Sequence, residues 1–169
     1  MGIAPGSGAV VTGAGRGIGE AIATRLAAGG VRVVVNDLDP DAAHRVAAAV
    51  GGFALVGDAA SQAGVDHLID AATDHLGRID AYFANAGVES STGLDSSEQT
   101  WERSLEVNLM GHVRAARRLV PEWIPSGGGR FVVTASAAGL LTMPTSAPYA
   151  VTKHAAVAFA EWLSMTYGR

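Results

Sequence analysis

The sequence has no cysteine, a single lysine, and no long basic or apolar run. Without cysteine, neither a disulfide framework nor a thiolate metal site can form. The net charge is −4 and no basic run exceeds Arg117-Arg118, so the positive surface that nucleic-acid binding requires is missing. No apolar run reaches bilayer-spanning length, and the first residues lack a secretory signal. We therefore expect a cytoplasmic protein that binds neither nucleic acid nor membrane.

What is present fits one packed domain. Of the 169 residues, 49% are apolar and 17% are charged, so we expect residues 1–169 to form a single globular domain. The histidines show no spacing with carboxylates that would define a metal site, so no metal is expected. We expect most of them at the surface; they are His44, His67, His75, His112 and His154.

Short β-branched runs alternate with longer segments of helical period. Strands are expected at 9–12, 31–36, 53–56, 81–84 and 130–136, and helices at about 17–28, 41–50, 63–76, 97–124 and 148–167. Near-continuous apolar strands separated by helices indicate a parallel sheet covered on both faces, because each crossover must carry the chain back over the sheet. The expected fold class is therefore α/β, a doubly wound parallel sheet of the Rossmann type. Pro121 should kink or nearly end the fourth helix.

The segment TGAGRGIG, residues 12–19, lies between the first strand and the first helix. Its glycines allow a tight turn and close approach of a pyrophosphate, and the helix N-terminus offers N–H groups and a positive dipole end. An ordinary glycine-rich turn explains the segment equally well when it is taken alone. The candidate cofactor-binding residues here are Gly13, Gly15, Arg16, Gly17, Ile18 and Gly19.

Two aspartates follow later strands. Asp37 ends the second strand, where a carboxylate can accept both ribose hydroxyls of an adenosine and repel a 2′-phosphate, which favours NAD over NADP. Arg16 argues for NADP, since a guanidinium pairs with phosphate, but we give Asp37 more weight. Asp58, after the third strand, could accept from the adenine amino group. The alternatives are a turn former for Asp37 and a helix N-cap for Asp58.

The lone lysine, Lys153, follows Tyr149 by four residues in a predicted helix. This spacing places the two side chains on one helix face, where a cation favours the phenolate form of tyrosine. A chance pair on a solvated face is the alternative. Because eleven arginines supply every other basic side chain, a retained lysine indicates a role for a compact ammonium.

Taken together, these motifs resemble the classical short-chain dehydrogenase/reductase family over essentially the whole chain. TGAGRGIG resembles its cofactor loop, NAG at 85–87 the motif after its fourth strand, VNLMG the long-helix asparagine, and YAVTK the catalytic pair. Ser136, thirteen residues before Tyr149, falls where the family has its catalytic serine. The sequence departs from many relatives at Ala84, where they have a second asparagine.

The resemblance implies roles for individual residues. Tyr149 would be the general acid/base, Ser136 would bind the substrate oxygen, and Lys153 would hold the nicotinamide ribose and stabilise the phenolate. Asn108 would place a water in the proton relay, while Asn85, Ala86 and Gly87 would lie beside the cofactor. The implied activity is hydride transfer between NAD(H) and a secondary alcohol or ketone, in a homo-oligomer.

The chain ends where the family's catalytic helix ends, so we expect the C-terminal strands and the substrate-covering segment to be missing. Two other hypotheses therefore remain beside a dehydrogenase. One is a cofactor-binding sensor without catalysis, and the other is an inactive dinucleotide-binding fragment.

Overall fold

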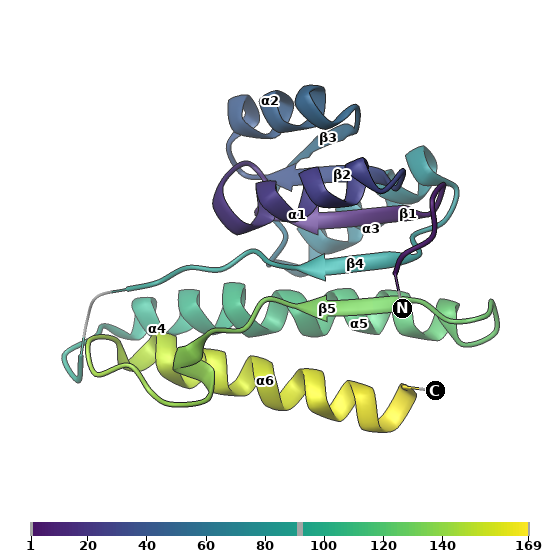
Figure 1. Cartoon of the computed structure of the whole chain (residues 1–169). Helices are drawn as coiled ribbons and strands as arrows, with labels where there is room; N and C mark the ends of the chain where they lie inside the picture. Colours follow the sequence, from purple (N-terminus) through teal and green to yellow (C-terminus); the bar gives the residue numbers. More distant parts are fainter. Residues whose placement is uncertain (1, 91–92, 169) are drawn as a thin grey trace.

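The computed structural model describes residues 2–90 and 93–168, which form a five-stranded parallel sheet in the order β3-β2-β1-β4-β5. The strands are β1 Gly8–Thr12, β2 Arg32–Asp37, β3 Phe53–Val56, β4 Ala81–Ala84 and β5 Arg130–Val133. All four pairings are parallel. The doubly wound α/β class is therefore confirmed (Figure 1).

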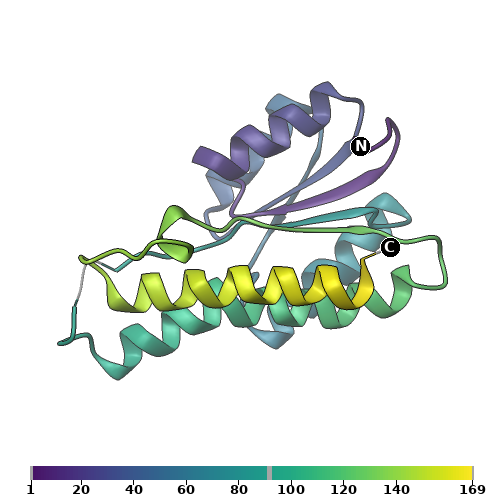
Figure 2. The same ribbon diagram turned by 60° about the horizontal axis from the view of Figure 1, so that its bottom comes forward.

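Two helical layers cover the sheet because alternate strand residues point to opposite faces. Val11 and Val35 pack with the helices α1 (Gly17–Ala28) and α2 (Pro40–Val50). Val10, Val34 and Tyr82 pack on the other face with the helices α3 (Gln62–Leu76) and α5 (Gly111–Trp123). The last helix, α6 (Ala147–Tyr167), lies beside α5 next to the edge strand β5 (Figures 1 and 2).

The expected long fourth helix is present as one continuous helical stretch with a π-helical turn inside it. It comprises α4 (Glu98–Leu105), a π-helical turn η1 (Glu106–Met110) and α5. Pro121 lies in the final turn of α5, which ends at Trp123 as expected for a proline near a helix end.

The fifth strand is shorter than expected. It ends at Val133 instead of residue 136, because Ser136 leaves the sheet and begins a short 3-10 helix, η2 (Ala137–Gly139). The Ser136 hydroxyl accepts from the Ala138 N–H at 3.2 Å and so caps this turn.

The strand order places a crevice at the carboxyl edge of the sheet. The chain runs outward from β1 through β2 to β3, then crosses back to β4 on the other side of β1. At such a switch point the loops after neighbouring strands diverge and leave room for a ligand. The segments after β1, β2, β4 and β5 all emerge at this edge (Figure 1).

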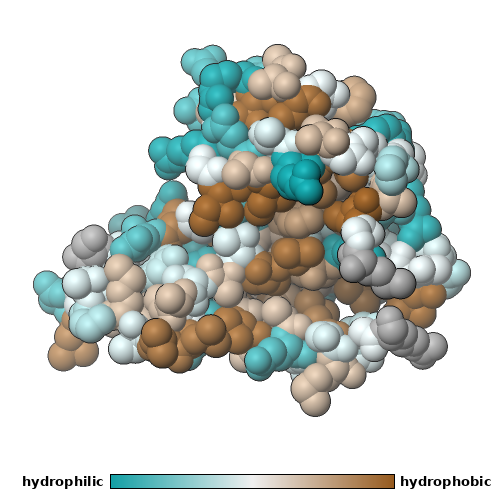
Figure 3. All heavy atoms as spheres, viewed as in Figure 1, coloured by the Kyte–Doolittle hydropathy of each residue, from teal (hydrophilic) through white to brown (hydrophobic). Residues whose placement is uncertain are grey.

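The outer surface carries exposed apolar side chains on α6 and the preceding loop. Figure 3 shows apolar atoms across the middle of one face and along its lower edge. Leu140, Leu141, Trp162 and Met165 are all more than half exposed. Within residues 2–90 and 93–168, no helix is both long and apolar enough to cross a membrane.

Candidate active site

A cavity of about 590 Å³ opens at the carboxyl edge of the sheet. Its walls come from the glycine turn, the ends of β2 and β3, the loop after β4, and α6. Eleven of the site residues expected from the sequence line it: Gly13, Arg16, Ile18, Gly19, Asp37, Asp58, Asn85, Ala86, Gly87, Tyr149 and Lys153. Gly15, Gly17, Asn108 and Ser136 are not part of its lining.

The glycine turn brings the β1 end close to the loop after β4. Gly13 has a φ of +58°, and a Cβ there would lie 2.9 Å from the Ala86 Cα. Gly17 has the same positive φ but faces open space. Only glycine adopts such backbone angles without strain, and α1 starts at Gly17 with its free N–H groups directed at the crevice.

Thr12 and Asn85 join the turn to the loop after β4. The Thr12 hydroxyl accepts from the N–H groups of Asn85 and Ala86, each at 3.0 Å. The Asn85 amide donates to the carbonyls of Thr12 and Gly13 at 2.9 and 3.1 Å. Its carbonyl oxygen accepts from Thr134 at 3.0 Å. These bonds hold the two loops at a fixed separation.

Asp37 is partly engaged by the backbone around it. One carboxylate oxygen accepts from the Gly15 N–H at 2.8 Å, and the other from the Asp39 N–H at 3.1 Å. Arg45 binds the Gly15 carbonyl at 2.8 Å and pairs with Glu20 at 2.8 Å. Gly15 is therefore held from both sides, and Asp37 keeps free lone pairs toward the cavity that it lines.

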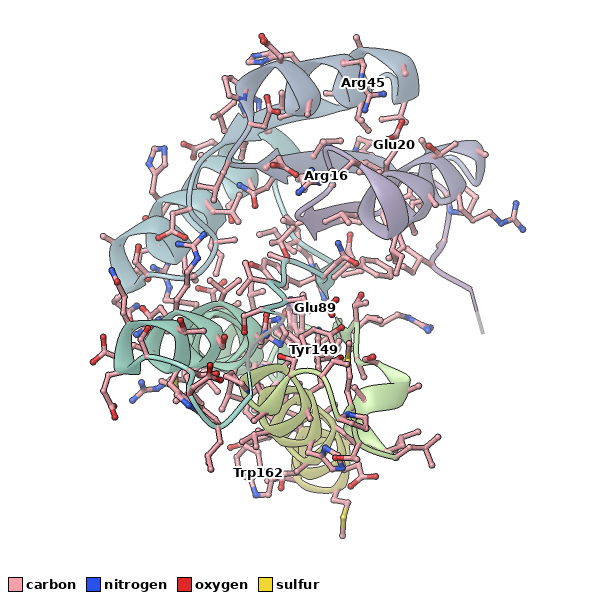
Figure 4. All side chains as sticks on the ribbon, turned by 90° about the vertical axis from the view of Figure 1, so that its left-hand side faces the viewer. Arg16, Glu20, Arg45, Glu89, Tyr149 and Trp162 are labelled. Carbon is pink, nitrogen blue, oxygen red and sulfur yellow. The ribbon has the colours of Figure 1, made fainter. Side chains whose placement is uncertain are left out.

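Asp58 caps the turn before α3. Its carboxylate accepts from the N–H groups of Ala60 and Ser61 at 2.9 and 3.1 Å. Burial raises the pKa of Asp58, but the hydrogen bonds from Ser61 and Ala60 outweigh burial, so the pKa is lowered. The capping alternative therefore describes its contacts, while an adenine contact remains a prediction. Arg16 lies exposed on the rim of the cavity, opposite Tyr149 (Figure 4).

Tyr149 and Lys153 lie on the same face of α6, as the spacing predicts. Ser146 caps the helix by accepting from the Tyr149 N–H at 3.3 Å. The Lys153 ammonium lies 5.7 Å from the Tyr149 ring centre and donates to the Thr134 carbonyl at 2.8 Å. Lys153 is only 3% exposed, and burial lowers its pKa. The alternative of a chance pair on a solvated helix face is therefore wrong.

Asn108 sits in the π-turn and is fully buried. Its side-chain oxygen accepts from the Val88 N–H at 2.8 Å, and its amide donates to the Val88 carbonyl and the Thr152 hydroxyl at 2.9 and 3.0 Å. It therefore ties the loop after β4 to α6. Ser136 has its hydroxyl on the Ala138 N–H.

Several residues that line the cavity belong to no recognisable sequence motif. Leu38, Glu89, Arg103 and Val107 line the same cavity as Tyr149. Val107 faces the cavity from the π-turn, which no pattern in the sequence predicted.

Four of the five histidines are exposed, which confirms that most of them lie at the surface, and His112 is the exception. His112 is 3% exposed, because it lies on the inner face of α5 behind the site. Within the described part of the chain, no group of three or more His, Cys, Asp or Glu residues could hold a metal ion.

The chain was compared with known proteins. The family model described as short chain dehydrogenase matches residues 7–169. A 1-deoxy-11-beta-hydroxypentalenate dehydrogenase from Streptomyces exfoliatus is 40% identical over 164 residues, which cover 92% of this chain and 60% of that protein. A cyclohexanol dehydrogenase from Acinetobacter sp. (strain SE19) is 33% identical over 166 residues, covering 94% of this chain and 66% of that protein.

The chain is also similar in structure to solved dehydrogenases. A short chain dehydrogenase/reductase from Burkholderia phymatum in complex with NAD has a TM-score of 0.93 at 34% identity, with 98% of this chain and 61% of that chain covered. A 7 alpha-hydroxysteroid dehydrogenase complexed with NADH and 7-oxo glycochenodeoxycholic acid has a TM-score of 0.91 at 31% identity, with 97% and 66% covered.

The chain spans about 60% of the length of the first of these relatives. The family model nevertheless covers nearly all of the chain, including the glycine turn, the loop after β4 and α6. The chain therefore belongs to the short-chain dehydrogenase family.

Proposed function

We propose that the protein is an NAD(H)-dependent oxidoreductase that interconverts a secondary alcohol and its ketone, with Tyr149 as general acid/base. One observation carries this proposal: the glycine turn, Asp37, Tyr149 and Lys153 all line the same cavity. A dinucleotide bound along that cavity would have its adenosine ribose near Asp37 and its nicotinamide near Tyr149 and Lys153. The relatives named as dehydrogenases support the reaction class.

The residues present fit NAD. The cavity volume of about 590 Å³ is within the range of small-molecule sites, and the N-terminus of α1 faces it. A pyrophosphate would lie at the glycine turn, and the adenosine ribose would meet Asp37. Asp37 favours NAD over NADP, because a 2′-phosphate would face its negative charge. The neighbours solved with NAD or NADH support this choice.

When bound, NAD supplies the hydride acceptor, and this chain's side chains handle the proton. Tyr149 as phenolate takes the hydroxyl proton of the alcohol, and in the reverse direction its hydroxyl returns a proton to the ketone oxygen. The Lys153 ammonium, 5.7 Å from the ring centre, stabilises the phenolate. The Ser136 oxygen accepts from the Ala138 N–H, and its own O–H proton is left to donate to the substrate oxygen. Asn108 would position a water of the proton relay.

We also propose that the protein works in the cytoplasm as a homo-oligomer, a dimer or tetramer. The family resemblance supports this assembly. Sedimentation of the natural protein tests the oligomeric state, and cell fractionation tests the location.

The decisive experiment uses the natural protein at full length with NAD⁺ and a panel of cyclic and linear secondary alcohols that includes cyclohexanol. We expect NADH to form with at least one secondary alcohol. Tyr149→Phe should reduce this rate by about 10³-fold or more, because it removes the proton acceptor, while NADH affinity stays nearly unchanged. Normal turnover by Tyr149→Phe would contradict the assignment. NADH binding without turnover of any alcohol would favour the sensor hypothesis instead.

A further inference from the structure

Gly15 belongs to the glycine turn but is not among the residues that line the cavity. A Cβ on Gly15 would lie 2.8 Å from the Asp37 Oδ2 and 2.8 Å from the Ala42 Cβ, so a side chain there would displace the Asp37 carboxylate. Gly15 is therefore packed against the group that is proposed to bind the adenosine ribose, and its effect on the cofactor passes through Asp37.

Two backbone N–H groups hold the Asp37 carboxylate. Its Oδ1 accepts from the Asp39 N–H at 3.1 Å, two residues along the chain. Its Oδ2 accepts from the Gly15 N–H at 2.8 Å, 22 residues away in the sequence. The first bond is local, whereas the second requires that the glycine turn hold the Gly15 peptide in place. The orientation of the carboxylate therefore depends on Gly15.

Arg45 of α2 holds the carbonyl side of Gly15. Its Nη2 donates to the Gly15 carbonyl at 2.8 Å. The same guanidinium donates to both carboxylate oxygens of Glu20 on α1, from Nη1 at 2.8 Å and from Nη2 at 3.1 Å. Figure 4 shows the Arg45 and Glu20 side chains pointing toward one another. A planar guanidinium bound to a carboxylate by two bonds has a fixed direction, so Glu20 aligns the donor that Gly15 receives.

An ordinary surface ion pair between two helices is the simpler explanation of these contacts. The Arg45 and Glu20 side chains are 56% and 35% exposed, and pairs at such exposure add little to stability. Arg118 forms a pair of this kind with Asp70 on the other face of the sheet. Arg45 differs from a simple surface pair because it also donates to the backbone of the cofactor turn.

We propose that Arg45, aligned by Glu20, is a positioning residue for Asp37: through the Gly15 peptide it holds the carboxylate in the orientation that receives the adenosine ribose. The ribose contact rests on the proposed function, whereas the chain of contacts from Glu20 to Asp37 belongs to the folded protein. Neither Arg45 nor Glu20 lines the cavity. Selectivity for NAD would thus depend on two residues that do not touch the cofactor.

The test removes both charges together, so that the net charge near Asp37 does not change. Glu20→Ala/Arg45→Met takes away the donor to the Gly15 carbonyl. The matched control is Asp70→Ala/Arg118→Met, which removes an ion pair between α3 and α5 without touching the turn. Thermal unfolding of both variants checks that they are folded.

Hydrogen exchange of the Gly15 amide is the first measurement. It is followed by NMR in the natural protein without cofactor, after labelling of glycine with ¹⁵N. We expect the Gly15 amide to exchange about tenfold faster or more in Glu20→Ala/Arg45→Met, because its bond to Asp37 opens more often. The control variant should keep the native rate. A native rate in folded Glu20→Ala/Arg45→Met would overturn the proposal, since the turn would then hold Gly15 without Arg45.

Titration with NADH and with NADPH is the second measurement. We expect NADH affinity to fall about fivefold in Glu20→Ala/Arg45→Met, because the Asp37 carboxylate is no longer held toward the ribose hydroxyls. NADPH affinity should change less, since Asp37 repels the 2′-phosphate and offers that cofactor no such bonds. Equal losses for both cofactors would overturn the positioning role, because they would indicate a general loosening of the turn.

The two measurements keep this inference apart from the proposed function. A native protein that binds neither NADH nor NADPH would refute the proposed function, and the Gly15 exchange, which needs no cofactor, would then decide whether Arg45 holds the turn. If Glu20→Ala/Arg45→Met does not fold, Arg45→Met alone is used for the exchange measurement, with Arg118→Met as its control. An unchanged Gly15 exchange rate in Arg45→Met would overturn the proposal in the same way.

Discussion

The cofactor half and the catalytic half of the site use different kinds of polar group. The cofactor half, residues 8–56, presents mainly backbone: a glycine turn, a helix N-terminus, and the Thr12 and Gly13 carbonyls, which accept from the Asn85 amide. The catalytic half, residues 106–167, buries more polar side chains than the two of the cofactor half, Thr12 and Asn36; they are Asn108, His112, Ser146, Thr152 and Lys153. A site made of backbone fails when a methyl group fills its space. One made of buried side chains fails when a donor or acceptor is exchanged, even for one of the same charge.

The largest effect is expected at Lys153. Lys153→Arg keeps the charge but cannot place a planar guanidinium where the ammonium binds Thr134, so we expect turnover to fall about 10²–10³-fold and NADH affinity to weaken. Lys153→Ala should lose at least as much turnover, because no cation then faces the Tyr149 ring. Steady-state kinetics measure the turnover, and fluorescence titration with NADH measures the cofactor affinity. Normal turnover by Lys153→Arg would mean that the catalytic half tolerates exchange of a buried donor for another of the same charge.

Acid should weaken the catalytic half through His112. Its folded pKa of about 4 lies below the ordinary 6.5, so the unfolded chain takes up the proton first. The stability that a neutral His112 provides is therefore complete above about pH 6.5 and is lost as pH falls toward about 4, by up to about 3 kcal/mol. His112→Gln should lose less stability than the native chain between about pH 7 and about pH 5.

Urea unfolding at the two pH values measures this difference. His67→Gln, at an exposed position of α3, is the matched control and should behave like the native chain. Equal losses in His112→Gln and the native chain would show that carboxylates alone cause the acid sensitivity.

Two glycines with the same φ, Gly13 and Gly17, sharpen the comparison in the cofactor half. Gly13→Ala and Gly17→Ala both place a side chain at a φ of +58°, which costs about 1–2 kcal/mol in each. Only at Gly13 would the new Cβ meet Ala86, at 2.9 Å. We expect Gly13→Ala to lose about 1 kcal/mol more folding free energy than Gly17→Ala. Equal melting curves would mean that the loop after β4 moves aside freely.

The smallest effect is expected in cofactor choice. The native chain should bind NADH more tightly than NADPH, and Asp37→Asn should narrow the difference about tenfold, since it removes the charge but keeps an acceptor for Gly15. Asp37→Ala should narrow it too, with weaker binding of both cofactors because the turn loosens. Asp39→Asn is the control. Tighter NADPH binding by the native chain would mean that Arg16 governs the site.

Much of the fold could be predicted from the sequence, because strands and helices follow local patterns. The apolar runs predicted all five strands, and α1 has the expected bounds of residues 17 and 28. The pairing of Tyr149 and Lys153 on one face also follows from spacing within a single helix, and their common face is confirmed by the 5.7 Å separation.

Other features depended on contacts between distant segments. The π-turn at 106–110 was not predicted, because it is fixed where Asn108 binds Val88 and Thr152 from other parts of the chain. Ser136 was expected to end a strand, but β5 stops at Val133, and the serine caps the next turn.

By itself, the sequence determined the α/β class, the glycine turn and the tyrosine–lysine pair, since each depends on residues within one or two turns of the chain. Only the tertiary structure decided that His112 is buried and that Lys153 is held by Thr134, nineteen residues away. Burial and hydrogen-bond partners depend on which helix face the sheet covers, and packing of distant elements settles that.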